Sequence, residues 1–259
     1  MANFLIQKSS MELEEYLVKE QLIKNKYLHT HKEIDLKELD KINERGLIPI
    51  GTIDFVTKYL RKSYDFKQEN PIEVPKYLRT EEFLKRDYYI TSYDKIPKHG
   101  TYFLKDVSEL KKFGMVVQSE YFLTDDIFKY VRKSDFDSTL VLSKEHKYLV
   151  SSVFHVAAEY RVYVLQGEIE NISYYDGDCT ILPDVNLIKK AINLISYNEK
   201  YLRSYTLDIM VDKNGNTAII EVHNFSSVGL YSNQWGSSLL YGYVDGIDYL
   251  LNDNKEIEI

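Results

Sequence analysis

Two acidic residues, Asp208 and Glu221, are predicted to face each other across a β-hairpin. Asn214-Gly215 separates two runs of alternating residues, which is a strong hairpin signal. Counting outward from a two-residue turn predicts the facing pairs Asp208–Glu221, Thr206–His223, Leu207–Val222, Ile209–Ile220 and Val211–Ala218. Side chains that face each other directly have Cβ atoms about 4.5–5.5 Å apart, so two half-buried carboxylates need a shared proton or a cation between them. A hard divalent ion such as Mg²⁺ meets this need, because it accepts carboxylates together with substrate phosphates. The alternative is a solvated face on which the two carboxylates repel weakly.

His223 could join the two carboxylates at such an ion, with Asn224 as the fallback. His223 shares the face of Glu221, whereas Asn224 turns to that face only if a bulge follows Val222. A histidine ligand would favour Mn²⁺ or another softer metal. The next segment, 224–229, is rich in small residues and could bring its backbone close to a ligand.

Three basic residues are candidates for binding phosphate. Lys105 ends a predicted strand at 100–105, and Lys112, with Lys111 as a close alternative, precedes a strand that starts at Met115. Arg161 lies on a predicted strand, on the same face as its neighbours at 159 and 163, and its planar guanidinium could neutralise phosphoryl oxygens. The simpler interpretations are solvated lysines and a surface pair between Arg161 and Glu159.

These segments, in this order, resemble an ATP-grasp ligase. The matching features are a strand with Asp, a hairpin, a strand ending in Glu-x-Asn/His, and a loop that contains glycine. One position departs from the usual family pattern Glu-x-Asn, because His223 lies two residues after Glu221 and Asn224 comes one residue later. The segments EVHNFSSVGLY and EYRVYVLQGEI are most similar to the phage- and bacteria-associated ATP-grasp clade that is defined by one Arg and two Lys. The resemblance covers roughly residues 45–245 by the order of elements.

The resemblance implies an α+β fold of the ATP-grasp type, in which two α+β lobes hold ATP between antiparallel sheets. Residues 1–98 would form an N-terminal pre-grasp α/β region and residues 99–259 the ATP-grasp domain. Within that domain, about 99–155 would cover the nucleotide and about 156–259 would bind the metal.

The resemblance also implies roles for individual residues. Arg161, Lys105 and Lys112 would be catalytic and would bind phosphates. Gln118, Ser119 and Glu120 would contact the adenine and ribose, and Glu159 would contribute to nucleotide binding. Asp208 and Glu221, with His223 or Asn224, would bind Mg²⁺ or Mn²⁺.

The implied reaction is an ADP-forming ligation, in which ATP activates a carboxylate as an acylphosphate that an amine then attacks. The first alternative is an AMP-forming ligase that acts on RNA or another polynucleotide, and the second is a non-catalytic ATP-binding module. The sequence does not identify the carboxylate and amine substrates, the nucleotide product or the oligomeric state.

Composition bears on these alternatives. The chain has 259 residues, 44% of them hydrophobic, which is enough for a sizeable core. Its 33 basic and 40 acidic residues give a net charge of −7, which weighs against a protein that mainly neutralises a nucleic-acid backbone. The single cysteine, Cys179, excludes an internal disulfide and suits a reducing cytosol. We identify no signal peptide and no stretch long enough to span a membrane, so we expect a cytoplasmic protein.

Helix signals occur along the whole chain. Capping pairs predict helices that start at Ser9 and at Leu36, and the second of these would run to Arg45 with Gly46 as its C-cap. Further helices are predicted after the strand at 47–51, near Thr80, after Asp184 and over 235–251, whereas 121–150 has no clear pattern. A second hairpin is predicted to turn at Gln166-Gly167.

Overall fold

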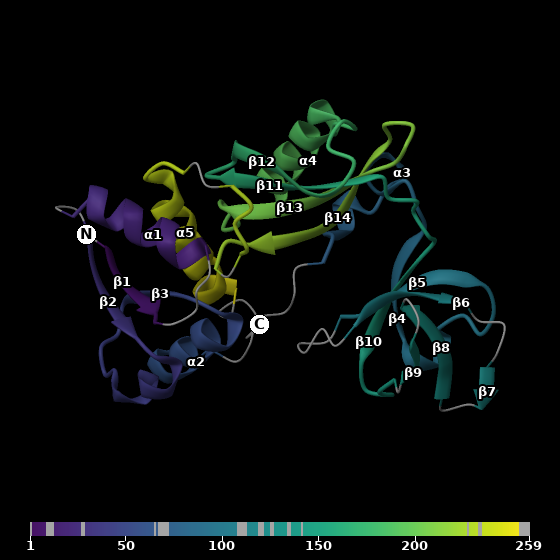
Figure 1. Cartoon of the computed structure of the whole chain (residues 1–259), viewed down its shortest axis with the longest axis horizontal. Helices are drawn as coiled ribbons and strands as arrows, with labels where there is room; N and C mark the ends of the chain where they lie inside the picture. Colours follow the sequence, from purple (N-terminus) through teal and green to yellow (C-terminus); the bar gives the residue numbers. More distant parts are fainter. Residues whose placement is uncertain are drawn as a thin grey trace.

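The computed structural model describes residues 2–8, 13–26, 29–64, 66, 73–107, 113–118, 122–124, 127–133, 136–140, 142–226, 228–232 and 235–253. These residues form three sheets that follow one another along the longest axis of the molecule (Figure 1). The first sheet is parallel, and the other two are antiparallel.

The N-terminal region is an α/β unit built around the sheet β2-β1-β3. Its elements are β1 (Ala2–Gln7), α1 (Leu13–Lys24), β2 (His29–Ile34), the 3₁₀ helix η1 (Leu36–Lys41), β3 (Leu47–Ile50) and α2 (Ile53–Ser63). Phe4 and Ile6 pack on one side with α1 and the last helix, α5 (Ser238–Asp253), and Leu5 packs on the other side with α2. This alternation is the period of two that a strand requires.

The second unit carries Lys105. A segment with η2 (Lys76–Leu78) and α3 (Glu81–Leu84) leads into β4 (Tyr88–Ser92), η3 (Tyr93–Lys95), β5 (Thr101–Asp106), β6 (Gly114–Gln118), β7 (Phe122–Thr124), β8 (Ile127–Lys133), β9 (Phe136–Leu140) and β10 (Lys147–Ser151). The sheet order is β4-β10-β5-β6-β8-β7, with β9 also paired to β8. The segment 121–150, which lacks a clear pattern in the sequence, therefore supplies four of these strands.

The third unit carries Arg161, Asp208 and Glu221. Its sheet has the order β12-β11-β13-β14, from β11 (Ala158–Leu165), β12 (Glu168–Gly177), β13 (Tyr205–Val211) and β14 (Thr217–Asn224). Helix α4 (Val185–Asn198) covers one face through its apolar side, and its N-cap is Asp184, as predicted. Arg161, Asp208 and Glu221, which lie directly across from one another, are on the opposite face.

The register between β13 and β14 partly corrects the prediction. Asp208–Glu221, Leu207–Val222 and Thr206–His223 pair as expected, but Ile209 pairs with Ile219 rather than Ile220. Val211 likewise pairs with Thr217 rather than Ala218.

Two offsets explain this difference. The turn holds three residues, Lys213 to Gly215, because Asp212 N donates to Asn216 O (3.0 Å) and Gly215 adopts a positive φ of 83°. The longer turn shifts the pairing of the two strands by one residue. A bulge at Ile220 reverses this shift, so Asp208 and Glu221 still face each other.

The helix predicted over Leu36–Arg45 is shorter than expected. A 3₁₀ helix ends at Lys41, and the Asp35 side chain makes no capping hydrogen bond. Gly46 has a positive φ of 77° but lies beyond this helix, and its N–H donates to the Tyr64 hydroxyl (3.0 Å). The other predicted helices and both hairpins are confirmed, with end points that differ by a few residues. The predicted cap at Ser9 lies outside the described residues.

The boundary at 98/99 stays a prediction. Strand β4 precedes it and pairs with β10, which follows it, so the second sheet draws strands from both sides of that position.

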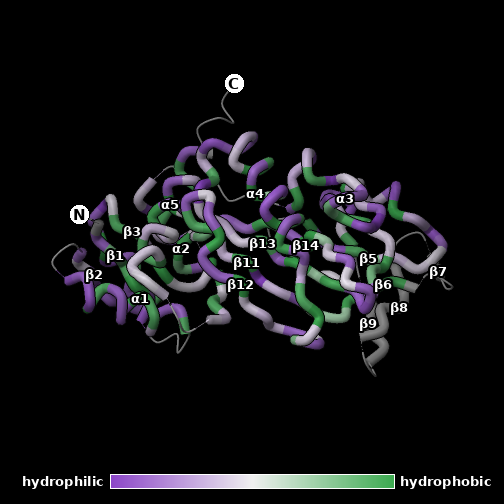
Figure 2. Tube along the Cα trace, turned by 90° about the horizontal axis from the view of Figure 1, so that it is seen from above, coloured by the Kyte–Doolittle hydropathy of each residue, from purple (hydrophilic) through white to green (hydrophobic). Residues whose placement is uncertain are grey.

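Hydrophobic and hydrophilic stretches are interspersed along the coloured parts of the trace (Figure 2). Among the helices that the structure describes, none combines the length and the apolar character needed to cross a bilayer.

Candidate functional site

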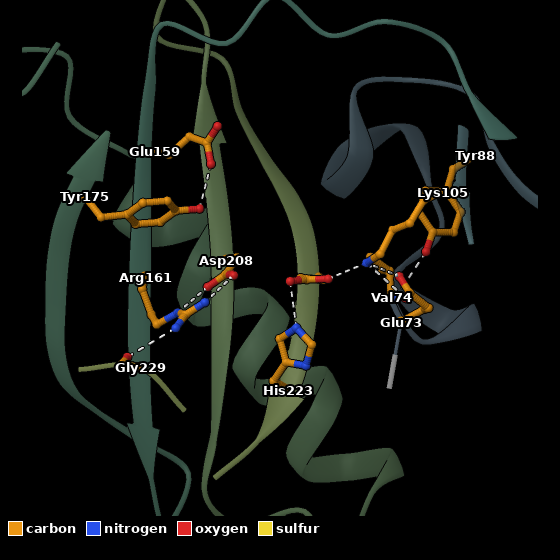
Figure 3. Close-up of polar contacts among 11 residues, drawn as sticks. Glu73, Val74, Tyr88, Lys105, Glu159, Arg161, Tyr175, Asp208, His223 and Gly229 are labelled. Atoms are coloured by element: carbon orange, nitrogen blue, oxygen red, sulfur yellow. Dashed lines mark hydrogen bonds and ion pairs between the residues drawn. The ribbon is translucent and has the colours of Figure 1, made fainter. Parts of the chain in front are cut away.

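Arg161 and Asp208 form a bidentate ion pair between neighbouring strands. Register places Arg161 on β11 directly opposite Asp208 on β13. Nε donates to Oδ1 and Nη2 to Oδ2, both at 2.7 Å, and Nη1 donates to the Gly229 carbonyl at 3.2 Å (Figure 3). The guanidinium also lies 5.0 Å from the ring centroid of Tyr231. Four contacts therefore fix the orientation of this cation.

Glu221 is the centre of a second group of charges. His223 Nε2 lies 2.6 Å from Glu221 Oε1, and Lys105 Nζ donates to Oε2 at 2.5 Å. Lys105 comes from β5 of the second sheet and also donates to Glu73 Oε2 at 3.2 Å, with Glu73 Oε1 at 3.0 Å. Lys105 thus joins the second sheet to β14 and to the segment before η2 (Figure 3).

The ionised state of these groups follows from their partners. Burial disfavours the Glu221 carboxylate, but His223 and Lys105 outweigh it and hold its pKa well below the usual range. Burial likewise opposes the charge on Lys105, yet Glu221 and Glu73 raise its pKa. The pKa of Arg161 is also raised, because Asp208 outweighs the cost of burial. We therefore treat all three as ionised at neutral pH.

Asp208, Glu221 and His223 offer a donor set that fits a divalent ion. One potential ligand atom from each of the three lies within 4.8 Å of the others. The two carboxylates are ligands that suit both Mg²⁺ and Mn²⁺, whereas the imidazole suits Mn²⁺ better than Mg²⁺. Each carboxylate oxygen keeps lone pairs beyond those that its present partners use, so the ion pairs with Arg161 and Lys105 do not exclude metal binding.

Asn224 is not brought to this group. It lies opposite Tyr205, on the other face of β14 from Glu221 and His223. Its Oδ1 accepts from Ser226 N at 2.9 Å and from Ser226 Oγ at 2.5 Å. The bulge that would turn Asn224 inward would follow Val222, whereas the observed bulge is at Ile220.

Glu159 lies on the face of Arg161 but does not pair with it. Its Oε2 accepts from the Tyr175 hydroxyl at 2.6 Å (Figure 3). Burial and this carboxylate both raise the pKa of Tyr175, so Tyr175 stays protonated and acts as the donor. Tyr175 in turn stacks on Tyr231, with ring centroids 4.9 Å apart.

The remaining predicted positions are less fully described. Gln118 is the last residue of β6 and pairs with Thr101; the structure describes its backbone but not its side chain. Lys111, Lys112, Ser119 and Glu120 lie outside the described residues.

Glu73 is not among the site residues that the sequence predicts. This carboxylate is buried at 7% exposure in a segment between Pro71 and Pro75 that has no periodic pattern. No sequence signal marks it, since its contact with Lys105 depends on how the segment packs against the second sheet.

We expect Glu73→Gln to lower the free energy of unfolding by about 1–3 kcal/mol, because the buried contact with the Lys105 ammonium loses its negative charge. Urea denaturation measures this. Glu82→Gln is the matched control, since Glu82 pairs with Lys190 at the surface and its loss should cost under about 0.5 kcal/mol. Equal effects of the two substitutions would mean that Glu73 does not hold Lys105 in solution.

Comparisons with known proteins identify the family and the fold of this chain. Residues 83–236 match the model of a family described as an ATP-grasp domain, family 2 of the R-two-K clade. D-Alanine–D-alanine ligase from Bacillus anthracis is similar in structure, with a TM-score of 0.50 at 13% identity over 99% of each chain. D-Cycloserine synthetase DcsG has a TM-score of 0.52 at 9% identity, over 97% of this chain and 100% of its own. At these identities the likeness concerns the fold alone. No curated protein sequence matches the chain significantly.

Proposed function

Because this chain belongs to family 2 of the R-two-K clade of ATP-grasp domains and has the ATP-grasp fold, we propose that it is an ADP-forming ligase that joins a carboxylate to an amine. The observation that carries the proposal is the convergence of Asp208, Glu221 and His223 between two cations, Arg161 and Lys105. Such a site combines a place for a metal–nucleotide complex with fixed positive charge on both sides of it.

The proposed reaction has two steps. An oxygen of the substrate carboxylate attacks the γ-phosphorus of ATP, and the bond to the β–γ bridging oxygen breaks to give an acylphosphate and ADP. The amine then attacks the acyl carbon, inorganic phosphate leaves, and the amine loses a proton. Positioning and neutralisation of charge supply most of the catalysis of such a transfer, so no general base is required for the first step.

In this proposal each residue has a role that its contacts support. Asp208, Glu221 and His223 would hold Mg²⁺ or Mn²⁺, which supplies positive charge at the phosphate oxygens when bound. Arg161 would face the transferring phosphoryl group, and Lys105 would bind phosphate oxygens near Glu221. Arg161, Lys105 and Lys112 would be the Arg and the two Lys of the clade.

Other assignments follow from the resemblance. Gln118, Ser119 and Glu120 are proposed for the adenine and ribose, and Glu159 for nucleotide binding through the face that it shares with Arg161. Asn224 remains an alternative metal ligand if the loop rearranges when nucleotide binds.

Nucleotide products test the proposed reaction. The purified protein is incubated with ATP, Mg²⁺ or Mn²⁺, and pools of amino acids, dipeptides and other carboxylic acids and amines. We expect ADP and inorganic phosphate in equal amounts, only when metal and a reacting acid–amine pair are both present. AMP and pyrophosphate would assign the protein to polynucleotide-ligase chemistry instead, and tight ATP binding without any product would indicate a non-catalytic module.

A further inference from the structure

The loop at 229–231 holds Arg161 through its backbone. Besides Arg161 Nη1, the Gly229 carbonyl accepts from the Tyr163 hydroxyl at 2.8 Å. The same hydroxyl accepts from Tyr231 N at 2.8 Å. Because Gly229 and Tyr231 both contact the Arg161 guanidinium, the position of this loop contributes to the orientation of Arg161 together with the ion pair to Asp208.

Leu230, which lies between Gly229 and Tyr231, is held by a residue outside the segment 83–236 that matches the family model. Leu230 N donates to Glu14 Oε1 at 2.6 Å, and Glu14 belongs to the first turn of α1 in the N-terminal region. Glu14 thus accepts the N–H of the one residue of this loop that Tyr163 does not hold. A hydrogen bond to an ionised carboxylate is about twice as strong as one between neutral groups.

Helix α1 is itself firmly placed against this loop. Leu17 and Leu22 of α1 pack with Leu230 in one apolar cluster. Gln21 Nε2 donates to the Trp235 carbonyl at 2.8 Å, just after the loop. Glu14 is therefore presented by a fixed helix rather than by a free surface.

The Glu14 carboxylate and the Arg161 guanidinium border the same glycine. A Cβ built on Gly229 would lie 3.4 Å from Arg161 Nη1 and 3.7 Å from Glu14 Oε1. A shift of the loop toward or away from α1 would therefore move the carbonyl that Arg161 binds.

We propose that Glu14 is a positioning residue: it holds the 229–231 loop so that Arg161 is oriented for the transferring phosphoryl group of ATP. This inference rests on the proposed function, because it needs Arg161 to face the γ-phosphate. It makes the N-terminal region a part of the site, although the family match begins at residue 83.

Affinities for two nucleotides test the role of Glu14. Isothermal titration calorimetry measures binding of the Mg²⁺ complexes of AMP-PNP, which has a γ-phosphoryl group, and of ADP, which lacks one. We expect Glu14→Ala to weaken AMP-PNP binding by about tenfold and ADP binding by less than about twofold. Glu14→Gln keeps an oxygen that can accept from Leu230 N and should retain most of the AMP-PNP affinity.

Glu20→Ala is the matched control. Glu20 lies on the same helix, is 39% exposed and pairs only with Lys24 among the described residues, so its removal should change neither affinity. Equal losses for both nucleotides, or no loss, in Glu14→Ala would overturn the role of Glu14. Failure of the wild-type protein to bind either nucleotide would instead reject the proposed function.

Discussion

Glu221→Gln is expected to weaken binding of Mn²⁺ in the presence of ATP by at least about 100-fold, because the central carboxylate of the donor set is lost. Turnover should fall by about 100–1,000-fold with it. The fold should persist, since Lys105 keeps its contact with Glu73. Electron paramagnetic resonance of Mn²⁺ measures the binding, and circular dichroism checks the fold.

The controls use the same sheet. Glu168→Gln changes an exposed glutamate of β12 and should leave Mn²⁺ binding unchanged. His223→Ala should weaken binding more than Asn224→Ala, because His223 shares the face of Glu221 and Asn224 does not. Unchanged Mn²⁺ binding in Glu221→Gln would remove this site from the proposal.

Arg161→Met is expected to destabilise the protein by about 3–5 kcal/mol, because it leaves the Asp208 carboxylate buried without its cation. Asp208 is only 4% exposed, so its carboxylate is largely shielded from solvent. Urea denaturation measures the loss. Arg161→Lys should also lose stability, since an ammonium cannot reproduce the bidentate contact.

A double variant separates stability from chemistry. Arg161→Met combined with Asp208→Asn removes both charges and should recover much of the lost stability. It should remain inactive, because the proposed phosphoryl contact and a proposed metal ligand are both absent. A single Arg161→Met variant as stable as the wild type would show that the buried pair does not form in solution.

Periodicity predicted the facing carboxylates but not the partner of Arg161. Strands alternate strictly, so the common face of Glu159 and Arg161 could be read from the sequence. Residues two apart on one strand are about 6.8 Å apart, whereas residues directly across two strands are about 4.5–5.5 Å apart. Arg161 therefore pairs with Asp208, and predicting this required the order of the sheet, which the sequence does not reveal.

Residues outside periodic segments could not be predicted in the same way. Glu73 lies in an irregular segment, and the contact of Glu14 with Leu230 joins residues 216 positions apart. Sequence patterns also identified neither β1 nor β2. The central residues of β2 are exposed, so no alternation of apolar and polar residues marks it, and it is held by parallel pairing to β1.

The bulge at Ile220 separates the tip of the hairpin from the carboxylates. The extra residue of the turn is offset by this bulge before the chain reaches Asp208 and Glu221, so their apposition depends on the turn and the bulge together. Relatives of this chain could therefore lengthen or replace the segment 212–216 over time without disturbing the metal ligands, provided that each odd change in length is matched by the gain or loss of a bulge. The same property makes the tip a suitable place to graft a reporter peptide.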